Sequence, residues 1–179
     1  MSHVFRSKDE DVVSLGDYKP YSVHKSEGGD YTNYPIHSGR ILDLKENKPH
    51  AVKHFSDLLD PELHDGIAIA VVPSHDPEAI GGGLASIASQ LATKGNRIDA
   101  SSALRRTVKI QKLAHGGDRS ITVHRESIEV ADAASIKGKH VLLLDDVHKS
   151  GNSLAACKEK LLAAGAASVH SACLGKTWG

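Results

Sequence analysis

Two adjacent carboxylates, Asp145 and Asp146, stand between a run of apolar residues and a loop of small polar residues. The apolar run, 141–144, has the length and composition of a strand buried on both faces, as in a parallel sheet. The loop, 149–153, precedes an apolar-periodic segment at 154–164 that predicts a helix. Because a helix N-terminus offers unpaired N–H groups and a positive dipole end, this loop suits a phosphate. The pattern indicates a sugar-phosphate site, with the carboxylates on sugar hydroxyls or a metal.

A simpler interpretation of the same residues is a solvated loop in which Asn152 or Ser153 caps the helix. The complete string 141–153, however, resembles the phosphoribosyl pyrophosphate signature of the type I phosphoribosyltransferases. That signature has four apolar residues, an acid, Asp, two mainly apolar positions, a variable position and then Thr/Ser-Gly-x-Thr/Ser. This sequence departs from it at His148, where the family usually has an apolar residue, and Lys149 occupies the variable position.

Alternating strand and helix patterns favour an α/β fold with a mostly parallel twisted sheet flanked by helices. An irregular or hairpin-like N-terminal hood, residues 1–60, is expected to precede a phosphoribosyltransferase-like core, residues 61–179, within one structural domain. The hood holds all four tyrosines and a helix expected at 49–59. The expected core elements are strands at 67–72, 102–104, 121–130, 140–144 and 168–174, and helices at 84–91 and 154–164.

Composition excludes several classes of protein. The 22 basic and 22 acidic residues balance, so the chain has no overall attraction to nucleic acid or to an anionic membrane. No apolar run approaches the length of a membrane span, and no secretory leader is visible at the N-terminus. The two cysteines are interpreted as small core residues, which favours a reduced, cytoplasmic setting. The twelve histidines form no transition-metal motif, so we assign no structural metal.

The resemblance also implies how pyrophosphate would be held. In the family, the loop after the first core strand binds pyrophosphate through backbone N–H groups. Here that loop is 73–83, with Ser74, His75 and Gly82 as the expected contacts. A plain flexible connector is the alternative interpretation.

A long basic loop that closes over the leaving group is a further feature of the family, and residues 104–120 occupy its place. The spacing of residues there resembles the ComF-like, competence-associated branch. Arg105 and Arg119 are the expected catalytic cations, and Arg106, Lys109 and Lys112 could also neutralise pyrophosphate. A solvated basic loop is again the alternative.

The remaining roles follow from the same resemblance. Asp145 and Asp146 would hold ribose hydroxyls or Mg²⁺, the metal that accompanies the substrate phosphoribosyl pyrophosphate. The 5′-phosphate would be bound by Lys149, Ser150, Gly151, Asn152 and Ser153.

The acceptor side is defined by fewer residues. Lys149 stands where 6-oxopurine enzymes carry an Asp that contacts the purine, so a purine acceptor is not expected. Its side chain could instead face the acceptor, the phosphate or the solvent. Lys176 matches a lysine that meets the exocyclic oxygen of the base, and Trp178 could stack on an acceptor ring or simply pack.

The function implied is a Mg²⁺-dependent transfer of the phosphoribosyl group to an anionic or non-purine acceptor. Two alternatives remain open at this point: a non-catalytic member of the fold that senses nucleotides or binds a partner, and an enzyme that hydrolyses or rearranges a phosphoribosyl compound. The family also implies a homo-oligomer.

Overall fold

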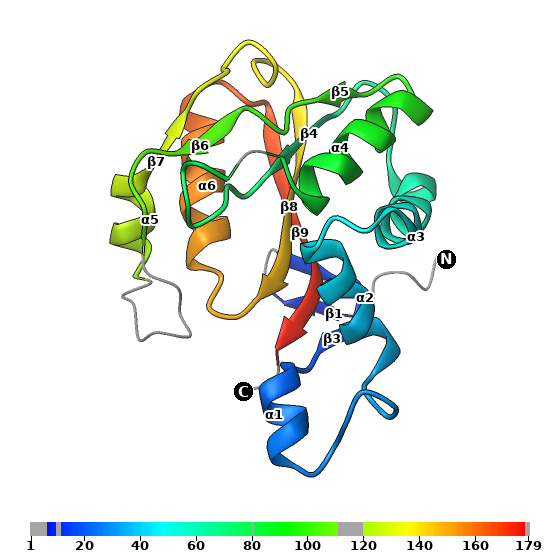
Figure 1. Ribbon diagram of the computed structural model, residues 1–179. Helices are drawn as coiled ribbons and strands as arrows, with labels where there is room; N and C mark the ends of the chain where they lie inside the picture. Colours follow the sequence, from blue (N-terminus) through cyan, green and yellow to red (C-terminus); the bar gives the residue numbers. More distant parts are fainter. Residues whose placement is uncertain (1–6, 10–11, 80, 111–119, 178–179) are drawn as a thin grey trace.

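The computed structural model describes residues 7–9, 12–79, 81–110 and 120–177. Its centre is a mostly parallel sheet (Figure 1). Across the sheet, the strands are β1 (Ser7–Asp9), β2 (Val12–Ser14), β9 (Ser168–Thr177), β8 (His140–His148), β4 (Ala68–Val71) and β5 (Ile98–Asp99). Among the described strands of this sheet, only β1 and β2 pair antiparallel. The predicted α/β architecture is therefore confirmed.

Two crossover helices connect the parallel strands and bring their carboxyl ends together. Helix α4 (Gly83–Lys94) links β4 to β5, and α6 (Asn152–Ala163) links β8 to β9. The register pairs Val71 with Leu144 across β4 and β8. Since ligands bind outside the carboxyl ends of strands in such sheets, this edge is where a site is expected.

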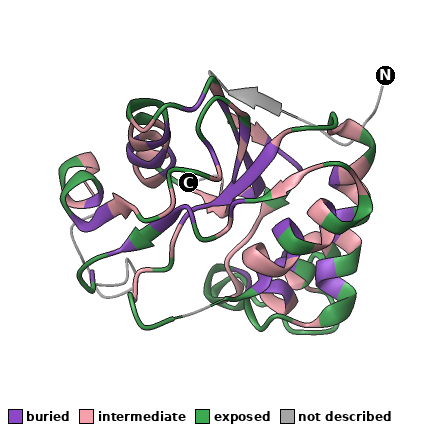
Figure 2. Cartoon of the chain, turned by 90° about the horizontal axis from the view of Figure 1, so that it is seen from above, coloured by how far each residue is buried: buried purple, intermediate pink, exposed green. Residues whose placement is uncertain are grey.

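Each face of the sheet packs against its own hydrophobic core. In β4, Ile69 and Val71 contribute to a core that includes residues of α2, α3 and α4, while Ala68 and Ala70 contribute to a core that includes residues of α6. Figure 1 shows the same division, with α2 to α4 on one side of the sheet and α5 and α6 on the other. Buried residues lie along the central strands and on the faces of the helices that pack against them (Figure 2). A sheet covered on both faces explains why its strands are continuously apolar.

The N-terminal residues join the sheet and add helices to it. Strands β2 and β3 (Asp17–Tyr18) pair in parallel with β9, and β1 and β2 form a short antiparallel pair. Helices α1 (Tyr21–Ser26), α2 (Ile36–Lys45) and α3 (Pro49–Leu59) follow, the last continuing into a 3₁₀ turn at Asp60–Glu62. The α3 bounds were predicted, whereas α1 and α2 were not. In α2, Ser38 and Gly39 interrupt the apolar pattern, so only tertiary packing of the buried Ile41 and Leu44 reveals it.

The strand expected at 121–130 is wrong over most of its length. Residues Ile121–Ser127 form helix α5, and only β7 (Ile128–Val130) is a strand, paired antiparallel with β6 (Leu104–Arg106). β-Branched residues suggested a strand, but Ser120 caps the helix by accepting a hydrogen bond from Val123 N. The strand expected at 102–104 lies slightly later in the chain, as β6 at Leu104–Arg106. Strand β5 was not predicted.

The two strands nearest the motif are longer than expected. Strand β8 continues through Asp145 and Asp146 to His148, because β9 pairs with it as far as Lys176. The two carboxylates thus belong to the last residues of a paired strand, and not to a loop after it. In the described part of the chain, no helix is both long and apolar enough to cross a membrane.

Candidate functional site

The carboxylates of Asp145 and Asp146 lie at the carboxyl end of β8. One oxygen of Asp145 accepts a hydrogen bond from Asp146 N at 2.8 Å, and the other accepts from Ser153 Oγ at 3.3 Å. Asp146 Oδ1 accepts from Val147 N at 2.6 Å, while its Oδ2 lies 3.5 Å from Lys45 Nζ. Burial, and then the charge of Asp146, raise the pKa of Asp145 to about 8. A bound cation or a donor from a ligand would favour its ionised form.

The phosphate-type loop connects this strand to α6. Gly151 adopts a left-handed conformation with φ 75°, and a Cβ there would lie 2.8 Å from His148 Cε1. The position therefore requires glycine. Ser150 Oγ accepts a hydrogen bond from Asn152 N at 3.5 Å.

The simpler interpretation of this loop as an ordinary helix cap by Asn152 or Ser153 does not hold. Gly151 is the residue that precedes the helix, and no side chain caps it. The Ser153 hydroxyl is directed to the Asp145 carboxylate, which joins the loop to the acidic pair.

The loop after β4 begins beside the same carboxylates. Val72 N donates to Leu144 O at 2.9 Å, so Val72 and Pro73 come next to the acidic pair of β8. Ser74 Oγ and His75 Nδ1 are 3.5 Å apart, and Gly82 adopts φ 99° just before α4. The predicted pyrophosphate contacts Ser74, His75 and Gly82 thus lie in a loop that starts at the acidic site.

The basic residues of segment 104–110 are arranged differently from one another. Arg105 is 67% exposed and forms an ion pair with Glu129 across the β6–β7 ribbon. Lys109 Nζ lies 2.8 Å from Asp76 Oδ2. Arg106 was expected to be a cation that could neutralise pyrophosphate. It is buried, and its guanidinium group contacts the backbone of the loop after β4. Arg119 and Lys112 lie outside the described residues.

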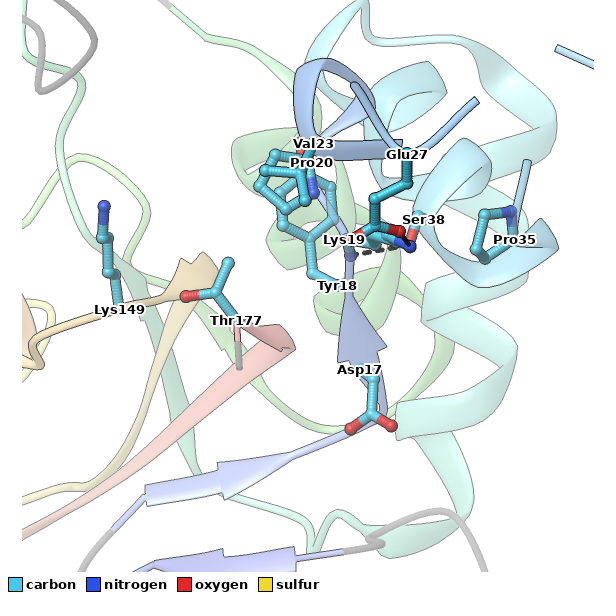
Figure 3. A pocket seen from close by; sticks show the side chains of 10 residues that line it. All are labelled: Asp17, Tyr18, Lys19, Pro20, Val23, Glu27, Pro35, Ser38, Lys149 and Thr177. Atoms are coloured by element: carbon cyan, nitrogen blue, oxygen red, sulfur yellow. Dashed lines mark hydrogen bonds and ion pairs between the residues drawn. The ribbon is translucent and has the colours of Figure 1, made fainter. Parts of the chain in front are cut away.

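A pocket of about 780 Å³ separates the motif from the N-terminal helices. Figure 3 shows Lys149 and Thr177 on one side of it, opposite Tyr18, Pro20 and Val23. The other residues lining it are Asp17, Lys19, Glu27, Pro35 and Ser38. Lys149 is exposed at its edge, so it lies where a molecule in the pocket would meet the end of β8.

The other two expected acceptor residues lie at the end of the chain. Lys176 pairs with His148 in the register of β9 and β8, next to Thr177 of the pocket wall. Trp178 lies outside the described residues.

Lys45 is a site residue that no motif could have identified. It sits in the last turn of α2, where its ammonium group reaches Asp146 and also lies 5.5 Å from the centre of the Tyr18 ring. Tyr18 is itself near the acidic pair: burial and then the charge of Asp146 raise its pKa. Lys45 and Tyr18 therefore connect the acidic pair to the pocket.

The donor set can be tested against a magnesium ion. Among the described residues, no three His, Cys, Asp or Glu side chains gather into a metal site. Two neighbouring carboxylates are nevertheless what Mg²⁺ uses when substrate phosphates and waters complete its coordination. Asp145 and Asp146 fit a metal that arrives with its substrate, and not one held by the protein alone.

Comparison with known proteins agrees with this geometry. The sequence model of the phosphoribosyl transferase domain matches residues 84–176, just over half of the chain, and includes the whole acidic motif. The chain belongs to the type I phosphoribosyltransferase family. Its likeness to the ComF-like branch stays a prediction.

Two solved structures of phosphoribosyltransferases match the chain at low identity. A purine phosphoribosyltransferase from Pyrococcus horikoshii is 19% identical, with 90% of this chain and 78% of that chain covered and a TM-score of 0.37. A hypoxanthine phosphoribosyltransferase from Staphylococcus aureus is 13% identical, with 77% and 74% covered and a TM-score of 0.43. No functionally curated protein matches the sequence.

Proposed function

We propose that this protein transfers the 5-phosphoribosyl group from phosphoribosyl pyrophosphate to a small anionic or carbonyl-bearing acceptor that is not a purine, with Mg²⁺ bound alongside the substrate. The observation that carries this proposal is the acidic pair Asp145 and Asp146, joined to the N-terminal loop of α6 by the Ser153 hydroxyl. The family membership supplies the reaction class.

The sugar phosphate would lie over the end of β8. The backbone amides of 150–153 at the start of α6 suit the 5′-phosphate, because they point along the positive end of the helix dipole. Asp145 and Asp146 would accept hydrogen bonds from the ribose hydroxyls. Mg²⁺, held by these carboxylates and by substrate oxygens, would supply Lewis-acid stabilisation of the leaving group.

In the transfer, the bond between ribose C1 and pyrophosphate breaks and the electron pair leaves with pyrophosphate. The acceptor forms the new bond to C1 and loses a proton. Positive charge develops on the sugar, where the carboxylates stabilise it, while the loop after β4 and Arg105 face the leaving group. Arg105 is the exposed arginine that we assign to this role.

Lys149 gives the acceptor its expected character. It lines the pocket from the sugar side, and it forms no ion pair with any described residue. Lys19, the other cation of the pocket, is already paired with Glu27. An acceptor with a carboxylate or carbonyl oxygen would satisfy Lys149, while its ring could rest on Tyr18 and Pro20.

Pyrophosphate release tests the proposal. The protein is incubated with Mg²⁺ and phosphoribosyl pyrophosphate, alone and with each member of a panel of nitrogenous aromatic acids, carbonyl heterocycles and purines. We expect release that depends on an acidic or carbonyl-bearing acceptor, and that is lost in Asp146→Asn but kept in Asp57→Asn. Asp57 is a matched control, since it pairs with Lys53 and Lys94 on α3 and α4, away from the site.

Two results would contradict the proposal. Binding of the substrate without pyrophosphate release for any acceptor would favour a non-catalytic sensor, and release without an acceptor would favour hydrolysis.

A further inference from the structure

Arg106 is a buried arginine that lies behind the loop after β4. The residue is 5% exposed. Its Nε donates to Ser74 O at 3.1 Å, and one terminal nitrogen, Nη2, lies 3.5 Å from Pro73 O. The other, Nη1, donates to Ser127 Oγ at 2.6 Å and lies 3.4 Å from His124 Nδ1. Because a buried guanidinium group must find acceptors for its five N–H groups, these contacts constrain both the arginine and its partners.

The carbonyl contacts set the direction of the peptide N–H groups in the loop. In a trans peptide, the C=O of one residue and the N–H of the next point in opposite directions within one plane. None of the described peptide bonds is cis, so drawing Pro73 O and Ser74 O toward Arg106 turns the N–H groups of Ser74 and His75 away from it. Arg106 thereby orients the donors that the family uses to bind pyrophosphate.

Two further contacts extend this support along the loop. Ile110 N donates to His75 O at 3.1 Å, and Lys109 Nζ lies 2.8 Å from Asp76 Oδ2. The first residues of the loop are consequently held by segment 106–110, at the place where β4 ends beside Asp145.

Helix α5 holds the Arg106 side chain in place through hydrogen bonds. Ser127 Oγ, which accepts from Arg106, itself donates to Val123 O at 2.6 Å. Arg125 joins α5 to α6 through two hydrogen bonds to Glu159, at 2.7 and 2.6 Å. The side chain of Arg106 is therefore fixed at the same time by the helix, by the β6–β7 ribbon and by the loop.

We propose that Arg106 is a positioning residue for pyrophosphate: it acts through the backbone of 73–75, which it holds in the binding conformation, and it does not touch the ligand. This inference rests on the proposed function, because it assigns pyrophosphate to that loop. It separates Arg106 from Arg105, which precedes it in the same strand and faces the solvent.

The test uses inorganic pyrophosphate with Mg²⁺ as the probe and compares two buried arginines. Arg97 is the matched control: its side chain is 6% exposed and donates to the backbone carbonyls of Leu91 and Leu63, but it lies at the amino end of β5, the opposite end of the sheet. Lysine at either position keeps the charge and loses most donors. We expect Arg106→Lys and Arg97→Lys to lower the melting temperature comparably.

Of these two variants, only Arg106→Lys should weaken pyrophosphate binding. We expect a loss of about tenfold, which corresponds to one charge-assisted hydrogen bond between residue 106 and the loop. Ser127→Ala, which retains the arginine and removes one acceptor, should weaken binding by about threefold. The acceptor KM should change in neither variant. Calorimetric titration is made at a temperature where all variants are folded.

Equal pyrophosphate affinity in wild type and Arg106→Lys would overturn the inference and leave the proposed function standing. An equal loss in Arg97→Lys would also overturn it, since the effect would then follow general destabilisation. Failure of the wild type to bind pyrophosphate would instead overturn the proposed function, and the inference with it.

Discussion

Replacing Asp145 by Asn should stabilise the unliganded protein, and the gain should grow with pH. Burial and the neighbouring Asp146 raise the pKa of Asp145 to about 8, from an ordinary value of 3.8. Between these two values the folded protein holds a proton that the unfolded chain has released, so this group's contribution to stability falls as pH rises. Above pH 8 the full penalty of a buried charge is present. Asparagine has nearly the same shape, and its amide oxygen can still accept from Asp146 N.

The expected size follows from the same environment. One pKa unit corresponds to about 1.4 kcal/mol. Because Asp145 shares its charge environment with Asp146, and its carboxylate accepts hydrogen bonds from Asp146 N and Ser153 Oγ, we expect a gain of about 2 kcal/mol in the free energy of unfolding at pH 8, and none near pH 4. Binding of Mg²⁺ with phosphoribosyl pyrophosphate should be lost in the same variant.

Urea unfolding of wild type and variant at pH 4, 6 and 8 measures the effect. Asp57→Asn is a control of opposite sign, because Lys53 and Lys94 lower the pKa of Asp57 to about 2. That pairing stabilises the protein above the ordinary pKa and is lost as pH falls toward 2, so Asp57→Asn should destabilise at pH 6 and 8. A pH-independent effect of Asp145→Asn, or a destabilisation at pH 8, would show that burial does not raise the pKa of Asp145.

Three other substitutions give separate expectations. Lys45→Met should lower the Mg²⁺ concentration needed for half-saturation at fixed substrate, since an ammonium group 3.5 Å from Asp146 competes with the metal. Its stability should change by less than about 1 kcal/mol. A higher Mg²⁺ concentration at half-saturation would contradict this expectation. Gly83→Ala should destabilise by about 3 kcal/mol in thermal denaturation, because its Cβ would lie 2.2 Å from Leu44 O. Gly39→Ala, in α2 with its nearest neighbouring atom at 3.7 Å, should be neutral or slightly stabilising, and equal effects at the two glycines would argue against the packing.

The core and the acidic motif could be predicted because their signals are local. Strand β8 is a continuous apolar run, and the α6 segment that follows Gly151 has helical periodicity, so strand, loop and helix are visible within one stretch of the chain. Helix α3 was predicted with its observed bounds because Val52, Phe55 and Leu59 repeat with helical spacing.

The elements that were missed depend on distant contacts. In α5, β-branched residues favoured a strand, but the buried His124 and Ser127 meet Arg106 only when they lie on one face of a helix. Strand β3 has only two residues and cannot be recognised alone, and it exists because β9 offers an edge for it.

The same distinction applies to the site. Asp145 and Asp146 belong to a motif and were identified, whereas Lys45 comes from a helix a hundred residues away in the sequence. A basic segment could be recognised at 104–110, but not the direction of each side chain. Successive side chains of a strand point to opposite faces, so Arg105 is exposed and Arg106 is buried. This alternation follows from the position of β6, which the sequence does not define.

Calorimetric titration with Mg²⁺ and phosphoribosyl pyrophosphate tests the central claim most directly. We predict saturable, Mg²⁺-dependent binding at submillimolar ligand by the wild type, and no binding by the double variant Asp145→Ala with Asp146→Ala. Absence of wild-type binding at millimolar ligand, or binding left unchanged by the double substitution, would contradict it.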